Sequence, residues 1–389
     1  MRIGVDASCW ATGRGYGRFA REVVRAMARV EPSNELFCIG DREALAAWPH
    51  PPANVRLVEV EQSVPPAAAA AARGRRTLGD ILQMSRAASA LPVDVFFFPA
   101  VYSFFPIWGR KPVVVTVHDS IAERFPKLAL GSWRSRLFWW MKVRLALRQA
   151  RLVVTVSEYA ARDVMTVLGI ARDRIRVAVE APSEEYRPSS GAEVEAIARK
   201  YGLDGNRWFL YLGGFNPHKR VDTIIAAHAA VAANRPAAPL LVLAGDATRD
   251  PFYSEVPRLH SEIAAAGTES LVRWVGYVPD ADLRHLIAGA VALLLPSQAE
   301  GFGLPAIEAA ACGTPVIATA ASPLPQLLDG GGIFHLPGDI PAIADAMAAL
   351  LDDEAKRTAM AERALAMARR LSWEDTARAV LGALSSAVG

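Results

Sequence analysis

The chain reads PSQAEGFGLPAIEAAACGTP over residues 296–315, and this stretch decides the fold. It follows the apolar run 291–295, which predicts a buried strand. Gly303 allows a tight turn, Pro305 suits the first position of a helix, and Gly313 is placed to end that helix. A strand, a glycine turn and a helix N-terminus in this order are typical of a parallel α/β layer that binds an anion.

The residues around the predicted helix start indicate which anion. The backbone N–H groups near Phe302, Gly303 and Leu304, together with the helix dipole, favour a phosphate. Glu300 and Glu308 bracket that positive end. A carboxylate beside a phosphate is repulsive unless it faces neutral donors, and sugar hydroxyls or a ribose diol are such donors. The alternative for Glu308 alone is a first-turn glutamate that only complements the dipole.

A second patch, LYLGGFNPHKR at residues 210–220, ends the first predicted strand of the second half. Gly213 and Gly214 let the backbone approach a ligand, and Lys219 or Arg220 can neutralise a diphosphate. Stabilising a departing diphosphate is the main electrostatic task in glycosyl transfer. The alternative is a capped helix start with solvated basic residues.

Two patches follow predicted strands of the first half. His118 comes directly after the run VVVTV, where it can hydrogen-bond a donor sugar or an acceptor, or be a satisfied structural histidine. Asp119 can orient that histidine or cap the next helix. The loop TGRGYGR carries Gly13, Gly15 and Gly17 and resembles a dinucleotide fingerprint only loosely, because no acidic residue is well placed after the next strand. It is expected to line the ligand cleft.

No metal site is predicted. Asp280 and Asp282 have the spacing of a metal-binding pair, but they follow a proline and open a helical run, so helix capping is favoured. Cys9, Cys38 and Cys312 are scattered without metal-ligand spacing, which favours small core residues in a reducing cytoplasm.

Composition sets the broad class. A chain of 389 residues suggests two domains, and 52% hydrophobic with 21% charged residues is typical of a globular protein. A net charge of +3 is too small to indicate nucleic acid as the main partner. We see no secretory signal and no apolar stretch of about 18 residues that could span a bilayer, so a cytoplasmic protein is expected.

Apolar runs that alternate with helical patterns predict two α/β domains. Nearly continuous apolar strands are required by a parallel sheet covered on both faces. The runs in the first half are 2–7, 36–40, 55–60, 93–99, 113–118, 152–157 and 175–180, and those in the second half are 208–213, 240–245, 272–276, 291–296 and 315–319. The turn-rich stretch 181–190 reads as a linker. We therefore expect two Rossmann-like, doubly wound domains facing across a cleft, residues 1–185 and 186–372.

Two segments stand apart from this pattern. Residues 65–76 are rich in Pro, Ala and Arg and predict a mobile loop near the cleft. Residues 131–150 combine three tryptophans with five basic side chains. Such a helix can lie on the anionic inner surface of a membrane, or pack normally with a solvated basic face.

These motifs resemble the retaining family-four glycosyltransferases of the GT-B fold, over nearly the whole chain. The strongest match is EGFGLPAIE at 300–308 followed by ACGTPV. Further matches are His118-Asp119, Val156-Ser157-Glu158, Gly213–Lys219 and Gly276–Pro279. The resemblance implies transfer with retained anomeric configuration, without a metal ion or a cofactor beyond the nucleotide diphosphate sugar. It also implies that the last helix, about 373–389, crosses back onto the first domain.

Carried over by position, the resemblance implies a role for each site residue. Glu300 contacts the transferred sugar and Glu308 the ribose hydroxyls, while Lys219 holds the diphosphate beside the amides of Phe302 to Leu304. Tyr277 and Val278 meet the nucleobase, and His118 touches the donor sugar near the reacting carbon.

The chain departs from the family pattern at three places. Gly214 stands where many relatives carry an arginine, so phosphate binding is expected to lean on Lys219, Arg220 or the first domain. His218-Lys219 replaces Arg-Lys, and Pro325-Gln326 replaces a common Pro-Glu.

The expected activity is transfer of a hexose or deoxyhexose to a hydroxyl of a glycan or lipid-linked glycan in cell-surface polysaccharide assembly, with His118, Glu300 and Lys219 as catalytic candidates. The alternatives are a nucleotide-sugar epimerase of similar shape and a sugar-nucleotide binding protein without turnover. A nicotinamide dehydrogenase ranks last.

Overall fold

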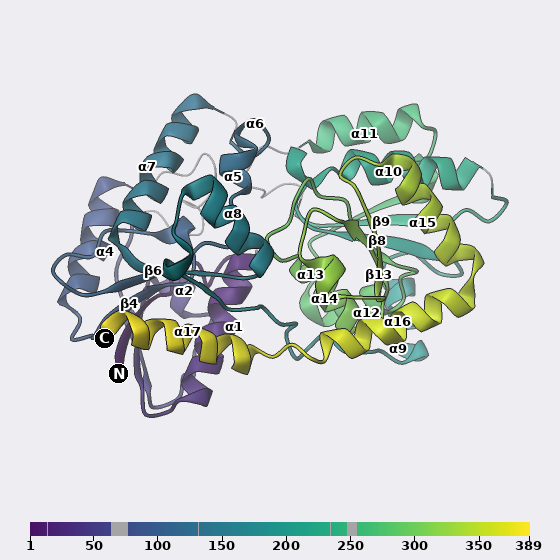
Figure 1. Ribbon diagram of the computed structural model, residues 1–389. Helices are drawn as coiled ribbons and strands as arrows, with labels where there is room; N and C mark the ends of the chain where they lie inside the picture. Colours follow the sequence, from purple (N-terminus) through teal and green to yellow (C-terminus); the bar gives the residue numbers. More distant parts are fainter. Residues whose placement is uncertain (14, 64–76, 131, 234, 247–254) are drawn as a thin grey trace. The chain divides into compact units, whose positions relative to one another are not determined.

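The computed structural model describes residues 1–13, 15–63, 77–130, 132–233, 235–246 and 255–389 (Figure 1). The predicted loop 65–76 lies outside the described residues. The chain forms two compact units, Met1–Glu180 with Ser372–Gly389, and Ala181–Leu371. The sequence placed this boundary between residues 185 and 186. Each unit is a parallel sheet covered by helices, so the prediction of two doubly wound α/β domains is confirmed.

The first unit contains a seven-stranded parallel sheet in the order β3-β2-β1-β4-β5-β6-β7. Its strands are β1 (Arg2–Asp6), β2 (Glu35–Gly40), β3 (Val55–Glu59), β4 (Val95–Phe98), β5 (Val113–Thr116), β6 (Ala150–Thr155) and β7 (Ile175–Val177). Every predicted run of the first half is therefore a strand. The order reverses between β1 and β4, and in such sheets ligands bind outside the carboxyl ends of the strands at this point. The glycine loop after β1 and His118 after β5 both lie at those ends.

Helices cover both faces of this sheet. They are α1 (Gly15–Val30), α2 (Arg42–Leu45), α4 (Leu78–Ala90), α5 (Ile121–Arg124), α6 (Pro126–Ala129), α7 (Trp133–Gln149), α8 (Glu158–Leu168) and α17 (Trp373–Val388), with short 3-10 turns at η1 (Val101–Ser103) and η2 (Arg172–Arg174). The last helix, α17, packs on α1. Arg29 pairs with Glu374 at 2.9 Å, and the Thr376 hydroxyl donates to the carbonyl of Val179 at 2.5 Å. The C-terminal segment thus belongs to the first unit.

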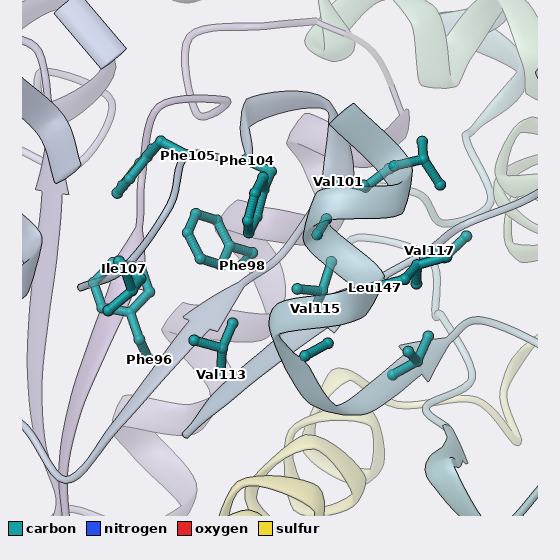
Figure 2. Close-up of a cluster of buried hydrophobic side chains, with 14 of the residues drawn as sticks. Phe96, Phe98, Val101, Phe104, Phe105, Ile107, Val113, Val115, Val117 and Leu147 are labelled. Carbon is teal, nitrogen blue, oxygen red and sulfur yellow. The ribbon is translucent and has the colours of Figure 1, made fainter. Parts of the chain in front are cut away.

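The core of the first unit is aromatic where β4 ends. The Phe98 ring lies 5.0 Å from the rings of Phe96, Phe104 and Phe105 (Figure 2). These side chains are almost fully buried and pack with Leu147 of α7 in one cluster. Burying such rings removes large apolar areas from water, so the strand ends that present the functional loops rest on a rigid base.

The second unit contains a six-stranded parallel sheet in the order β10-β9-β8-β11-β12-β13. Its strands are β8 (Trp208–Leu212), β9 (Leu240–Ala244), β10 (Val272–Gly276), β11 (Leu293–Leu295), β12 (Val316–Thr319) and β13 (Gly332–His335). The sequence did not predict β13, because this four-residue strand begins at the last of three consecutive glycines, Gly330–Gly332, which are typical of a turn. The order reverses between β8 and β11, which places the loops after these two strands side by side.

The helices of the second unit are α9 (Gly191–Lys200), α10 (Val221–Ala233), α11 (Val256–Ala265), α12 (Asp280–Ala288), α13 (Leu304–Ala311), α14 (Leu324–Leu327), α15 (Ile340–Asp352) and α16 (Glu354–Ala368), with 3-10 turns at η3 (Pro217–Lys219) and η4 (Glu269–Leu271). In the described parts of the chain, no helix is both long and apolar enough to cross a membrane.

Candidate active site

The helix predicted from the quoted stretch is α13, and its ends are built by glycines. Gly303 is the N-cap with φ of 93°, and a Cβ there would lie 2.9 Å from Leu324 Cδ1. Both the backbone conformation and the space favour glycine. Pro305 occupies the second helical position rather than the first, because Leu304 already opens the helix. At the other end Gly313 has φ of 75°, which confirms its predicted role in ending the helix.

The start of α13 presents unused backbone donors. Among the described residues, none accepts a hydrogen bond from the N–H groups of Phe302, Gly303 or Leu304. The side chains of Phe302 and Leu304 are buried, so these amides are fixed on a packed turn. Together with the positive end of the helix dipole they form the kind of site that binds a phosphate.

Lys219 and Glu300 come from different loops, and the sequence predicted that both belong to one site. The structure brings them into contact beside the start of α13. Lys219 Nζ lies 2.7 Å from Glu300 Oε1, although 81 positions separate them. The Ser297 hydroxyl donates to the same oxygen at 2.6 Å. No described residue donates to Glu300 Oε2. The carboxylate is therefore held through one oxygen, while the other is available to accept a hydroxyl.

The two loops that carry this pair are tied together through their backbones. The amide of Gln298 donates to the carbonyl of His218 at 2.8 Å, and the amide of Glu300 donates to the carbonyl of Ala321 at 3.0 Å. Between η3 and α10, Arg220 has φ of 52°, a conformation that costs a non-glycine residue about 1–2 kcal/mol. The turn that presents Lys219 is thus strained and is held by its surroundings.

The guanidinium of Arg220 is bound by neighbouring side chains. Its Nε lies 3.2 Å from Asp222 Oδ1, and its Nη1 lies 3.4 Å from Gln298 Oε1. Asp222 also pairs with Arg258 at 3.6 Å. The sequence named Lys219 or Arg220 as the diphosphate partner, and both are paired within the protein, Lys219 with Glu300 and Arg220 with Asp222.

Glu308 is deep in the site rather than at the rim of the helix. It is the fifth residue of α13, and the first turn of that helix holds no acidic residue. The alternative that made it a first-turn partner of the dipole is therefore wrong. Its side chain is buried. A buried carboxylate carries a large desolvation cost, which fits a group built to bind a ligand or a fixed partner.

The other residues predicted for the donor site differ in exposure and packing. Tyr277 follows β10 and is 69% exposed, whereas the neighbouring Val278 is buried. A Cβ at Gly213 would lie 2.9 Å from the hydroxyl of Tyr211, and that hydroxyl donates to the carbonyl of Gly214. Gly213 thus makes room for the Tyr211 side chain, a packing role that the sequence did not indicate.

In the first unit His118 is enclosed by protein groups. Its Nδ1 lies 3.3 Å from Glu180 Oε1, and its Nε2 lies 2.9 Å from the carbonyl oxygen of Pro99. The ring meets Phe19 edge to face with centroids 4.8 Å apart. The described partners of its two ring nitrogens are thus Glu180 and Pro99 rather than Asp119, whose carboxylate accepts from the amide of Ile121 at the start of α5. A sugar contact by His118 therefore requires one of its two partners to give way.

The glycine loop after β1 divides into two parts. A Cβ at Gly17 would lie 2.5 Å from the carbonyl of Thr12 and 2.7 Å from that of Cys9, so this glycine permits close packing of α1 on the loop. Gly13 and Gly15 have open space where a Cβ would stand. The space beside these two glycines leaves room for a ligand, and the predicted cleft role of all three glycines stays a prediction.

The acidic pair in α12 is not a helix cap, which corrects the prediction. The N-cap of α12 is Pro279, without a side-chain bond. Asp280 accepts from the hydroxyl of Tyr186 at 2.8 Å, and Asp282 accepts from Lys200 and from Tyr201 at 2.9 Å. Both acids fix α12 to the segments before β8. Within the described ranges no group of three or more His, Cys, Asp or Glu side chains could hold a metal ion.

The three cysteines are free and buried, as predicted for core residues. Burial raises the pKa of the Cys9 and Cys38 thiols far above their usual range. Burial and the nearby charge of Glu308 raise the pKa of Cys312 to about 12. All three thiols therefore stay protonated and unreactive near neutral pH.

Comparison with known proteins identifies the family. Residues 13–178 match the model of Glycosyltransferase Family 4, and residues 193–367 match that of Glycosyl transferases group 1. The chain belongs to the group 1 glycosyl transferases. Its two sheets match the GT-B enzyme HepE of Anabaena, solved with UDP and glucose, with a TM-score of 0.74 and 20% identity over 99% of this chain and 100% of that one. WaaG, a glycosyltransferase involved in lipopolysaccharide biosynthesis, gives a TM-score of 0.72 and 15% identity over 99% and 100%. At these identities the likeness shows the fold alone.

The curated relatives of this group 1 glycosyl transferase are named as sugar transferases of different kinds. The O-antigen chain mannosyltransferase B of Escherichia coli is 32% identical over 231 residues, which are 59% of this chain and 59% of the relative. The D-inositol 3-phosphate glycosyltransferase of Nocardia farcinica is 29% identical over 283 residues, 72% of this chain and 62% of the relative. The chain thus spans less than two thirds of the curated relatives that it matches here.

The sequence did not predict two side chains of this glycosyl transferase that contact the candidate residues Glu300 and His118. Ser297 is fully buried and bonds Glu300, and its place three residues earlier in the quoted stretch was the available signal. Glu180 pairs with His118 from 62 positions away, and no local pattern announces such a partner.

Proposed function

We propose that the chain is a retaining glycosyltransferase that moves a hexose or deoxyhexose from a nucleotide diphosphate sugar to a hydroxyl of a glycan or lipid-linked glycan. We assign it to cell-surface polysaccharide assembly. The support is the family, together with relatives named as O-antigen and serotype-specific mannosyltransferases. These names make mannose the first hexose to test.

The observation that carries this proposal is the Lys219–Glu300 pair beside the open amides of α13. A nucleotide diphosphate sugar offers an anion and neutral hydroxyls next to each other. The diphosphate fits the Lys219 ammonium and the amides of Phe302 to Leu304, while the sugar hydroxyls fit Glu300. We propose that these groups supply the positive charge for the diphosphate without a metal ion or a further cofactor.

We propose the reaction course that the family resemblance implies. The bond between the anomeric carbon and the phosphate oxygen breaks, and its electron pair stays on the phosphate. The acceptor oxygen bonds to the anomeric carbon on the same face, which retains its configuration. The acceptor proton passes to the departing phosphate oxygen. Lys219 and the helix amides stabilise the charge that develops there, and one such contact is typically worth on the order of a hundredfold in rate.

For the other residues we propose contacts that follow the resemblance. The ribose diol bonds Glu308, and the nucleobase lies beside Tyr277 and Val278. For His118 we propose that the donor sugar replaces the Pro99 carbonyl at Nε2, because a neutral carbonyl is a weaker partner than the carboxylate at Nδ1. Gly13, Gly15 and Gly17 border the acceptor or the phosphates.

The test is to incubate the purified chain with GDP-mannose, UDP-glucose and other nucleotide sugars, with and without a glycan acceptor, and to measure released nucleotide. Transfer that depends on the acceptor and yields a product of unchanged anomeric configuration is expected, with full rate in the presence of a metal chelator. A free, epimerised sugar formed without acceptor would indicate an epimerase. Donor binding without nucleotide release in any combination would contradict the proposal.

A further inference from the structure

We propose that the outer face of α7 binds the surface of a phospholipid bilayer that contains anionic lipid. This helix is only partly used by the core. Its buried side chains are Val143, Ala146 and Leu147, all in the second half. The first half, residues 133–141, contributes no buried side chain. The outer side of more than two helical turns therefore has no covering partner among the described residues of the first unit.

The uncovered face is strongly apolar. Of the thirteen large apolar side chains that are exposed among the described residues, six belong to α7. Trp133 is 67% exposed and Trp140 is 54% exposed. The other four are Leu137, Phe138, Met141 and Leu145. Scattered exposed apolar residues are normal, but a concentration of this kind on one helix indicates a binding surface.

The helix that carries this face is basic and contains no acid. The helix carries Arg134, Arg136, Lys142, Arg144 and Arg148, and no Asp or Glu between residues 133 and 149. The cations lie over the rings of their neighbours, in the pairs Arg134–Trp133 at 5.5 Å, Lys142–Phe138 at 5.7 Å and Arg144–Trp140 at 5.3 Å. Rings and cations are thus interleaved rather than separated.

Helix geometry places these side chains on one side. At about 100° per residue, Trp140, Trp133, Leu137, Met141, Leu145 and Phe138 fall within an arc of roughly 160°, and Arg134, Arg144 and Arg148 fall inside the same arc. Of the three buried residues, Val143 and Ala146 lie outside this arc by about 60° or more, and Leu147 borders it, about 20° from Trp140. A bilayer surface meets such a face along its whole length.

The inner side of α7 is firmly anchored, so the exposed face is not the result of a loose helix. The Trp139 indole donates to Glu123 Oε1 at 2.7 Å, and its ring lies 5.0 Å from that of Tyr102. Tyr102 stacks in turn on Tyr16 of α1 at 4.7 Å. Lys142 Nζ donates to the carbonyl of Tyr102 at 2.6 Å. This stack also links α7 to the glycine loop that precedes Tyr16.

The chemistry of the face selects lipid over protein as its partner. Aromatic, Met and Arg side chains are enriched at protein interfaces as well, but a helix with five cations and no acid between residues 133 and 149 favours a surface of uniformly negative charge. Helices that lie in a membrane interface combine tryptophan and aliphatic side chains with Lys and Arg, and anionic headgroups attract those cations. This inference goes beyond the proposed function and does not depend on it.

The test uses the full chain without any sugar and measures flotation with vesicles. One set consists of phosphatidylcholine alone, and the other contains about one quarter phosphatidylglycerol, an anionic lipid. Wild type is expected to float with the anionic vesicles and to be released by high salt. Three variants probe the face: a single variant, Trp133→Ser; a triple variant, Trp133→Gln/Phe138→Gln/Trp140→Gln; and a double variant, Arg134→Gln/Arg144→Gln. Two matched controls lie in the second unit: the single variant Leu336→Gln and the double variant Arg369→Gln/Arg370→Gln.

We expect the triple and the double variant each to bind anionic vesicles about tenfold or more weakly, and the single variant to fall between them and wild type. The controls remove an exposed apolar side chain and two exposed cations from the second unit, and they should bind like wild type. Circular dichroism verifies folding, and the single variant keeps the test valid if the triple one unfolds. The proposal is overturned if wild type does not float, if the face variants float like wild type, or if the face instead forms a dimer that the triple variant abolishes without vesicles.

Discussion

The Glu300→Gln substitution tests the centre of the site with the smallest change of shape. Glutamine keeps the volume of the side chain and can still accept from the Ser297 hydroxyl, which lies 2.6 Å from Oε1. What it removes is the charge that faces Lys219 Nζ at 2.7 Å. The variant therefore separates the carboxylate's charge from its packing.

The expected magnitudes follow from burial. The side chains of Lys219 and Glu300 are 23% and 11% exposed, so the pair lies between a surface salt bridge and a fully buried one. Surface pairs contribute up to about 1 kcal/mol, and breaking a buried one costs about 3–5 kcal/mol. We expect a loss of about 1–2 kcal/mol in stability, or a few degrees in the melting temperature of a unit of this size. The rate of transfer should fall by on the order of a hundredfold or more, because the uncharged side chain at position 300 holds the sugar poorly and no longer holds Lys219 in place.

The assay is acceptor-dependent nucleotide release at saturating donor, together with thermal unfolding. Asp282→Asn is the matched control, since Asp282 also pairs with a lysine through a side chain that is 20% exposed, in α12 rather than in the candidate site. That variant should lose comparable stability and keep its activity. Lys219→Ala should abolish transfer as Glu300→Gln does. A folded Glu300→Gln protein that turns over within about threefold of wild type would refute the assigned role.

Three further substitutions test the framework. Gly303→Ala should cost about 1–3 kcal/mol, because of its φ of 93° and the contact with Leu324, and should weaken donor binding measured by calorimetry. Gly17→Ala should destabilise the first unit by about 1–3 kcal/mol in urea unfolding, since its Cβ would press on the Thr12 carbonyl. Burial, with a smaller contribution from a nearby acid, raises the pKa of Glu123 to about 7. The folded state then keeps a proton that the unfolded state releases above about pH 4.5, so stability should fall as pH rises from there to about 7. Glu123→Gln should flatten that pH dependence, and an unchanged slope would contradict the assignment.

The sequence predicted the strands well because buried parallel strands are nearly continuous apolar runs, as β4 and β5 illustrate. It missed β13, whose four residues begin within a glycine stretch. In the site, strand ends were sufficient to bring Lys219 and Glu300 into one region across 81 positions. The partners of His118 could not be predicted, because they depend on which side chains packing brings together.

Opposite charges side by side in the site discriminate between ligands. Inorganic phosphate or a nucleoside diphosphate satisfies Lys219 but brings negative charge toward Glu300, whereas a nucleotide sugar places neutral hydroxyls against that carboxylate. The sugar thus stands between the diphosphate and the Glu300 carboxylate, which repel each other. In the proposed reaction, the diphosphate faces Glu300 after the sugar has been transferred, and the repulsion between them favours release of the diphosphate. Replacing Glu300 with glutamine removes this repulsion. The Glu300→Gln protein should therefore bind the nucleoside diphosphate more tightly relative to the intact donor than wild type does, and calorimetric titration with both ligands measures that ratio directly.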